Sequence, residues 1–177
     1  MEDMEETPKI VREIVVDTNP HETPLFDALR EEEGTPVRRE RLDVGDVILR
    51  AHGETLILER KTFADLASSL ADGRSHEQRA RQLAAVGQDA DGKTRVAWLI
   101  EGPLSQHDMV TAGGKPVRAI ECALIKASIR DGIYVIRIPD AKTLAATVLY
   151  LFRSLDAGEL DGDSAAQRRA AAGYADT

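Results

Sequence analysis

The sequence predicts an α/β protein, arranged as a three-layer α/β/α sandwich with a central mixed sheet. Three observations favour this class. Apolar strands alternate with helical segments along most of the chain, which is typical of layered α/β folds. Many of these strands are apolar on both faces, as expected for a sheet that helices cover on both sides. The length of 177 residues suits one domain that buries a core of its own.

The first half of the chain predicts four strands and one helix. Runs of apolar residues mark the strands, and glycines mark the places where an element ends or the chain turns. In order, the elements are a strand ending at Asp17, a helix over 23–34 closed by Gly34, a strand ending near Leu42, a strand over 46–50 after a break at Gly45 and, beyond a turn at His52-Gly53, a strand over 54–61.

The second half predicts two more strands and four helices. Pro116 suits the first turn of one helix, and Asp140 can cap the last one. In order, the elements are helices over 62–71 and 75–86 separated by a turn at Asp72-Gly73, a loop over 87–93, a strand over 94–102 with Trp98 as a core residue, a loop over 105–115, a helix over 116–132, a strand over 133–138 and a helix over 140–156.

The two ends of the chain are polar. Residues 1–11 are predicted to be a disordered acidic leader and residues 158–177 a flexible polar tail, which leaves a folded domain over 12–157. No apolar run is long enough to cross a membrane, so no membrane partner is expected. The single cysteine, Cys122, excludes a disulfide framework and fits a reducing intracellular compartment, the nucleus or the cytoplasm.

The charge of the chain is acidic but uneven. A formal net charge of −8 argues mildly against a nucleic-acid-binding protein, because contacts to phosphates need Lys and Arg. Acidic residues crowd the leader and the segments 30–34 and 156–163, whereas Arg74, Arg79 and Arg81 lie close together. These arginines are candidates for DNA contacts, and ordinary solvated helix charge is the alternative interpretation.

The hairpin over 46–61 brings charged residues together at the end of an apolar strand pair. A turn centred between His52 and Gly53 places Asp46 opposite Glu59, and side chains opposed in this way have Cβ atoms roughly 5 Å apart. Lys61 shares the face of Glu59, whereas Arg60 points to the other face, because side chains alternate along a strand.

Two carboxylates held close together in a poorly solvated place need a shared proton or a cation. Oxygen ligands favour Mg²⁺ or Mn²⁺, and such an ion can activate a phosphodiester for hydrolysis. Lys61 is placed to orient the attacking water or to offset charge on the phosphate oxygens. The alternative is an exposed strand end that carries a surface Glu–Lys ladder, which stabilises a fold very little.

Longer motifs favour the first interpretation. The segment from Val44 to Arg74 resembles the nuclease domain of the XPF family of structure-selective DNA endonucleases. The family motif is Gly-Asp on one strand and Glu-Arg-Lys-x-x-x-Asp on the next, and the matching residues here are Gly45, Asp46, Glu59, Arg60, Lys61 and Asp65. The similarity continues weakly through most of residues 13–155 and includes Asp72, Gly73, Gln78, Glu101 and Gly102.

The resemblance implies a restriction-endonuclease-like fold and a nuclease that depends on Mg²⁺ or Mn²⁺ and works as a dimer. Its substrate would be branched DNA, such as a flap, fork or junction, cut near the boundary between single strand and duplex. By the same resemblance Asp46 and Glu59 would hold the metal and Lys61 would serve the attacking water. The same active-site constellation would include Arg60, Asp65 and Asp17.

The segment after Asp17 departs from the family pattern. The family follows this aspartate with x-Arg-Glu, whereas Asn19 and Pro20 stand here. Glu22 can substitute for the missing acid through a longer loop, but no neighbouring residue replaces the arginine. A catalytically silent domain, which binds branched DNA or pairs with an active nuclease subunit, therefore stays as an alternative. A protein-interaction scaffold without DNA affinity is a third.

Two further predictions concern partners. Arg74, Gln78, Arg79 and Arg81 are the candidate DNA-binding residues. The helix over 141–156 carries Leu149 and Tyr150 outside its apolar stripe, which favours a homodimer through the nuclease domain. The polar tail cannot form the helix-hairpin-helix modules that family members append, so duplex binding is expected from this domain or from a separate DNA-binding partner.

Overall fold

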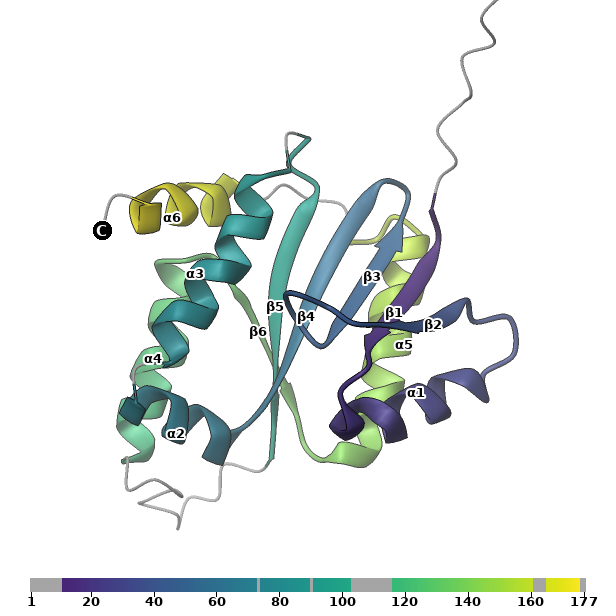
Figure 1. Cartoon of the computed structure of the whole chain (residues 1–177), viewed down its shortest axis with the longest axis horizontal. Coiled ribbons are helices and arrows are strands. Elements are labelled where there is room, and N and C mark those ends of the chain that lie inside the picture. Colours follow the sequence, from purple (N-terminus) through teal and green to yellow (C-terminus); the bar gives the residue numbers. More distant parts are fainter. Residues whose placement is uncertain (1–10, 73, 90, 103–115, 161–164, 176–177) are drawn as a thin grey trace, which may run out of the picture.

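The structure is a computed structural model that describes residues 11–72, 74–89, 91–102, 116–160 and 165–175. Its centre is one mixed sheet of six strands in the order β2-β1-β3-β4-β5-β6 (Figure 1). β3 runs antiparallel to both of its neighbours, and the other neighbouring pairs are parallel. The strands are β1 (Glu13–Asp17), β2 (Val37–Glu40), β3 (Val47–Ala51), β4 (Glu54–Thr62), β5 (Thr94–Glu101) and β6 (Tyr134–Ile138).

Helices cover both faces of this sheet, and the predicted three-layer α/β/α class is confirmed (Figure 1). The helices α1 (Thr23–Arg30) and α5 (Leu144–Asp156) pack on one face. The other face is covered by α2 (Phe63–Asp72), α3 (Arg74–Gly87) and α4 (Val117–Ile129). Two 3-10 turns, η1 (Pro20–Glu22) and η2 (Ala141–Thr143), precede α1 and α5.

Each face has its own apolar core, and the alternation along β3 and β4 feeds both cores. Leu49 and Leu58 join the core beneath α5, whereas Ile57 and Trp98 join the core beneath α3 and α4. Because neighbouring residues of a strand point to opposite faces, a strand between two cores must be apolar at nearly every position. This explains the continuous apolar runs that predicted a covered sheet.

The turn between β3 and β4 consists of His52 and Gly53, as the sequence predicts. Both residues have positive φ angles, 50° for His52 and 77° for Gly53, which suits a two-residue hairpin turn of type I′. The ring nitrogen Nε2 of His52 lies 2.6 Å from the backbone oxygen of Asp156, at the end of α5.

The predicted cap at Asp140 is also present. The side chain of Asp140 accepts a hydrogen bond of 3.0 Å from the backbone N–H of Thr143.

The prediction of a flexible tail over 158–177 is wrong for the helix α6 (Ala165–Ala175). Gln167 of this helix is buried, and its side chain bonds both backbone groups of Val96 and the backbone oxygen of Gly132. Ala-rich sequences are good helix formers, and tertiary contacts of this kind hold such a helix in place. Residues 1–10, the whole predicted loop over 105–115, and Gly73 lie outside the described residues.

The predicted role of Leu149 in a homodimer is also corrected. Leu149 is buried in the same core as Leu144 and Val148, because α5 rests deeply on β3 and α1. Leu149 and Tyr150 are the two residues that lie outside the apolar stripe of this helix in the sequence. Of these two, only Tyr150 lies on the surface, with 67% of its area exposed.

Candidate active site

The open end of the β3–β4 hairpin carries the two carboxylates that the sequence places opposite each other. Val47 pairs with Leu58, so the next residues along the two strands, Asp46 and Glu59, face each other. The backbone N–H of Asp46 donates to the backbone oxygen of Leu58 over 2.8 Å, which extends the ladder to the site. The site therefore lies at the carboxyl ends of β1 and β4, beside the start of β3.

Gly45 allows this approach of the two strands. Its φ angle is +79°, and a Cβ atom at this position would lie 2.6 Å from Cγ2 of Ile57 and 3.1 Å from the backbone oxygen of Leu58. Side chains are strained at such a φ, and the space is already filled. Because glycine has no Cβ atom, the backbone at residue 45 can lie this close to β4, and Asp46 therefore lies against the same strand.

Asp46 is tied to β4 by its side chain as well. Its Oδ2 atom accepts a hydrogen bond of 2.7 Å from the backbone N–H of Arg60. The backbone of a strand is held in place by the neighbouring strands. A carboxylate that is bonded to this backbone therefore keeps a fixed direction. Asp46 and Glu59 both line the openings of the site.

Glu59 is held by two glutamines of α3. Gln82 donates from Nε2 to Oε2 of Glu59 over 2.9 Å, and Gln78 donates from Nε2 to Oε1. Lys61 donates from Nζ to Oε1 of Gln78 over 2.5 Å and lies 3.7 Å from Oε1 of Glu59. Trp98 donates from Nε1 to Oε1 of Gln82 over 2.8 Å. Glu59 and Lys61 are almost completely buried, with 6% and 5% of their areas exposed.

Burial and mutual repulsion shift the titration of these acids. Burial, with the charge of Asp46 as a second cause, raises the pKa of Glu59 to about 7, although Lys61 and the two glutamine amides oppose the rise. Burial also raises the pKa of Asp46, while its bond from the Arg60 backbone lowers it. Two acids that resist ionisation together in a cleft are typical of a cation site.

Arg60 points to the other side of the sheet from Lys61, as predicted. Its guanidinium group bonds Oε2 of Glu101 at 2.9 Å and lies 3.6 Å from Oε1 of Glu22. Glu22 is buried, its Oε2 atom accepts no hydrogen bond from the described residues, and burial together with the charge of Asp46 raises its pKa. The structure therefore adds a third acid that the sequence only suggested, together with the partner that neutralises it.

Asp65 has a clear structural role at the start of α2. Its Oδ2 atom accepts bonds of 2.6 Å from the hydroxyl and 3.3 Å from the backbone N–H of Thr62, and its own N–H donates to that hydroxyl over 3.0 Å. This reciprocal pair is a capping box. It fixes the direction in which the chain leaves β4 directly after Lys61.

Asp17 lies beside the site, where its charge contributes to the raised pKa of Asp46 and of Glu22, and its carboxylate is bonded to the neighbouring loops. Its oxygens accept hydrogen bonds from the backbone N–H groups of Leu42, over 2.9 Å, and Asn19, over 3.3 Å. Arg39 of β2 holds the same loop through the backbone oxygens of Asp17 and Asn19. The structure therefore gives Asp17 a loop-supporting position, and Glu22 occupies the opening to the site.

Two openings reach Asp46 and Glu59 from opposite sides. One cavity, of about 340 Å³, lies toward α1 and the loop after β1. The other, of about 140 Å³, lies toward α3. Besides the two carboxylates, the first is lined by Asn19, His21, Glu22, Arg60, Thr62 and Asp65, and the second by Asp43, Val44, Gly45, Gln78, Arg81 and Gln82.

The four candidate DNA-binding residues do not share one environment. Arg81 is exposed and borders the smaller opening, and Arg74 is exposed at the start of α3. Arg79 is turned inward, where its NH1 atom lies 3.4 Å from the buried carboxylate of Asp131. Gln78 faces Glu59 and Lys61. The helical spacing of α3 explains the difference, since successive residues point about 100° apart.

The donor set of this site fits a hard divalent cation. Within the ranges that the structure describes, no group of three or more His, Cys, Asp or Glu side chains is arranged to hold a metal ion. The carboxylates that face each other here are those of Asp46 and Glu59. Mg²⁺ is commonly bound in this way, through one or two carboxylates, several waters and the phosphates of a substrate.

Sequence reasoning missed two residues of the site, Gln82 and Trp98, which support Glu59 from behind. Glu101, which the family resemblance included without a role, binds Arg60. Gln82 lies four residues after Gln78 on α3, and this spacing was the one signal that both amides share a helix face. Nothing in the sequence around Trp98 distinguishes its indole N–H from that of an ordinary core residue.

Comparisons with known proteins identify the family of this chain. The family model of the ERCC4 domain matches residues 12–151. The chain is 27% identical over 119 residues to the ERCC4 domain-containing protein EP364R of African swine fever virus (isolate Pig/Kenya/KEN-50/1950), covering 66% of this chain and 31% of that protein. It is 29% identical over 124 residues to the structure-specific endonuclease subunit MUS81 of Danio rerio, covering 63% of this chain and 19% of that protein. The chain thus matches only a third or less of the length of these relatives.

Two solved structures of XPF have a fold similar to that of this chain. XPF from Aeropyrum pernix in complex with DNA superposes with a TM-score of 0.63 and 25% sequence identity, covering 86% of this chain and 68% of that one. XPF from Aeropyrum pernix in a second structure gives a TM-score of 0.61 and 27% identity, covering 82% and 68%. No helix within the described ranges combines the length and apolar character needed to span a bilayer.

Proposed function

Because the chain belongs to the ERCC4 domain family and has the fold of the XPF nuclease domain, we propose that it is a divalent-metal-dependent endonuclease that cuts branched DNA. The cut is placed near the boundary between single strand and duplex, in a flap, fork or junction. The observation that carries the proposal is the pair of carboxylates, a half-buried Asp46 and a buried Glu59, with the amine of Lys61 at 3.7 Å from Glu59. Burial raises the pKa of both carboxyl groups, and a bound cation would favour their ionised forms, which supports the proposal.

Asp46 and Glu59 are the residues that would hold Mg²⁺ or Mn²⁺. When bound, the ion supplies positive charge to the phosphate oxygens and lowers the pKa of the attacking water. Lys61 lies on the same face as Glu59, where its ammonium group orients that water or balances charge that develops on the phosphate. Arg60 faces the larger opening from the other side and holds Glu22 and Glu101 in place.

DNA contacts are proposed for the surface around the two openings. Arg81 is exposed at the smaller opening and Arg74 is exposed at the start of α3, and each can bind a phosphate. The net charge of −8 makes such a local basic surface important, because the rest of the protein repels DNA. Gln78 is assigned to Glu59 and Lys61, and Arg79 to the support of α3, on the basis of their bonds.

Pairing with a second copy is proposed at the edge strand β6 and the outer side of α4. Ile125 and Ile129 of α4 are 54% and 82% exposed, and exposed apolar patches of this kind mark partner surfaces.

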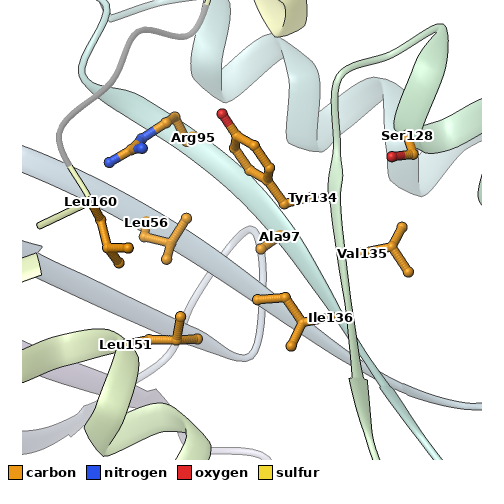
Figure 2. A pocket seen from close by; sticks show the side chains of 9 residues that line it. All are labelled: Leu56, Arg95, Ala97, Ser128, Tyr134, Val135, Ile136, Leu151 and Leu160. Atoms are coloured by element: carbon orange, nitrogen blue, oxygen red, sulfur yellow. The ribbon is translucent and has the colours of Figure 1, made fainter. Parts of the chain in front are cut away.

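A cavity beside β6 adds to the apolar surface at this edge of the sheet (Figure 2). It has a volume of about 370 Å³ and is lined by Leu56, Arg95, Ala97, Ser128, Tyr134, Val135, Ile136, Leu151 and Leu160. Sedimentation equilibrium of the wild type and of Ile129→Asp tests this, with a dimer expected only for the wild type.

The direct test of the activity uses the purified chain with Mg²⁺ or Mn²⁺ and labelled flap, fork and four-way-junction DNA. Cleavage is expected for the wild type and loss of cleavage for Asp46→Asn and Lys61→Ala. Absence of cleavage by the wild type, or undiminished cleavage by both variants, would reject the proposal. Binding of forked DNA without cleavage would instead support the silent-domain alternative, in which the chain pairs with an active subunit or a separate DNA-binding partner.

A further inference from the structure

Behind Glu59 lies a buried pair of side chains, Gln82 and Trp98, which a chain of hydrogen bonds connects to this carboxylate. Gln82 is 1% exposed and Trp98 is 2% exposed. The indole Nε1 of Trp98 donates to Oε1 of Gln82 over 2.8 Å, and Nε2 of Gln82 donates to Oε2 of Glu59 over 2.9 Å. Trp98 is also the direct partner of Glu59 in the parallel β4–β5 ladder, so both side chains leave the sheet on the same face.

The chemistry of these groups allows only one orientation of the Gln82 amide. An indole N–H can only donate, and an ionised carboxylate can only accept. The oxygen of Gln82 must therefore face Trp98, and its NH₂ group must face Glu59. Gln78 is fixed in the same way, because the ammonium of Lys61 is also a pure donor and takes the oxygen of that amide.

The two amides grip Glu59 together. Gln78 and Gln82 are one turn apart on α3, so they lie on the same face of the helix. One donates to each carboxylate oxygen of Glu59. Without the indole N–H, Gln82 would keep its place but lose the partner that selects its orientation. An amide rotated by half a turn would present its oxygen to the carboxylate and repel it.

We propose that Trp98 and Gln82 are positioning residues, which orient the carboxylate of Glu59 for a divalent cation through the bond from the indole to the amide. This inference rests on the proposed function, because it assigns a role within the same site. It gives a polar role to a tryptophan whose ring also fills the core. In this proposal Trp98 touches neither the cation nor the DNA, and its N–H reaches Glu59 through Gln82.

The test compares three variants in a Mn²⁺ titration followed by electron paramagnetic resonance. Trp98→Phe removes the N–H but keeps an aromatic ring, which preserves the contact of Lys61 with the ring at 5.9 Å. Gln82→Leu removes the amide. The matched control is Gln167→Leu, which removes another buried glutamine that binds only backbone groups of Val96 and Gly132.

Groups that orient metal ligands change affinity by about 10- to 100-fold when they are removed. We therefore expect the Kd for Mn²⁺ to rise at least about tenfold in Gln82→Leu and by several-fold in Trp98→Phe. Gln167→Leu is expected to keep the wild-type Kd even where it lowers the melting temperature. In the Gln82→Leu background, Trp98→Phe should add no further change, because the amide through which it acts is gone.

Two further measurements separate positioning from a general loss of packing. The Mg²⁺ concentration for half-maximal cleavage should rise in Trp98→Phe, while the rate at saturating Mg²⁺ stays within about twofold of wild type. In the wild type, hydrogen exchange of the Trp98 indole N–H should be slow, because the bond to Gln82 is buried. This last measurement needs no variant to fold.

The outcomes distinguish this inference from the proposed function. A wild type that neither binds Mn²⁺ nor cleaves DNA would overturn the proposed function and, with it, the role of the pair. A wild type that binds Mn²⁺, together with a folded Trp98→Phe of unchanged affinity, would overturn the positioning inference alone. So would an indole N–H that exchanges as fast as one exposed to solvent.

Discussion

The backbone N–H of Arg60 donates a hydrogen bond of 2.7 Å to the carboxylate of Asp46, across the open end of the β3–β4 hairpin. This bond anchors one acid of the site to the strand that carries the other, because Glu59 directly precedes Arg60. Asp46 and Glu59 therefore stay together although their charges repel. The arrangement stores unfavourable energy at the point where a cation is proposed to bind.

Replacement of Asp46 by Asn should abolish cleavage and stabilise the metal-free protein. The amide oxygen of Asn keeps an acceptor for the N–H of Arg60, and its NH₂ group can donate to Glu59 in place of the repulsion. At pH 8 we expect the free energy of unfolding to rise by about 1 kcal/mol, measured by urea denaturation without divalent ions. At pH 5 the gain should shrink, because Glu59 is then largely protonated. A destabilised Asp46→Asn at pH 8 would contradict this account.

Replacement of Gly45 by Ala should be far more costly than the same change at Gly53. Both glycines have φ angles near +78°, but an added Cβ meets Ile57 and Leu58 at Gly45 and nothing within 4 Å at Gly53. We expect a loss of about 3 kcal/mol for Gly45→Ala, from strain and overpacking, and about 1 kcal/mol for Gly53→Ala, from strain alone. Thermal and urea unfolding measure both. Equal losses would show that the close contact with β4 is unimportant.

Binding of Mn²⁺ should strengthen as the pH rises through 7. The pKa of Glu59 is raised to about 7 from a usual value of 4.5, so a proton competes with the cation below that pH. We expect the Kd to fall between pH 5.5 and 8 and to level off above, in calorimetric titrations. A Kd that stays constant over this range would mean that Glu59 is not a ligand.

The stability of the metal-free protein should change in the opposite direction. Because the folded pKa of Glu59 lies above its unfolded value, the unfolded chain releases the proton first, and stability falls as the pH rises from about 4.5 to 7. A shift of this size corresponds to roughly 3 kcal/mol. Saturating Mn²⁺ should therefore raise the melting temperature more at pH 8 than at pH 6.

Substitutions of Arg81 and Arg79 should have different effects. The first should weaken DNA binding, and the second should lower the stability of the fold. Arg81 is exposed at the smaller opening, so Arg81→Ala should weaken binding of forked DNA, reduce the slope of log K against log salt by about 1 and leave stability unchanged. Arg79 pairs with the buried Asp131, so Arg79→Ala should lower stability by about 2 kcal/mol. Fluorescence anisotropy at several salt concentrations and urea unfolding measure the two effects. An Arg79→Ala variant of full stability but weakened DNA binding would reverse the assignment.

The sequence predicted the hairpin accurately because a hairpin is specified by local rules. Turn residues fix the register, and alternation along a strand fixes the faces, so the opposition of Asp46 and Glu59 and the separation of Lys61 from Arg60 follow from residues within sixteen positions of one another. The sandwich class followed similarly from the alternation of apolar strands and helices. The roles assigned to Asp46, Glu59 and Lys61 stay predictions that the cleavage assay tests.

What the sequence by itself determined is thus the strand pair and the chemistry at its open end, because neighbours along the chain decide them. Only the tertiary structure decided what surrounds that end. It placed Gln78 and Gln82 against Glu59, brought Glu22 into the larger opening, turned Arg79 inward and docked α6 through Gln167. These contacts depend on how helices settle on the two faces of the sheet. That arrangement is set by packing between segments far apart in the chain, which no short stretch of sequence records.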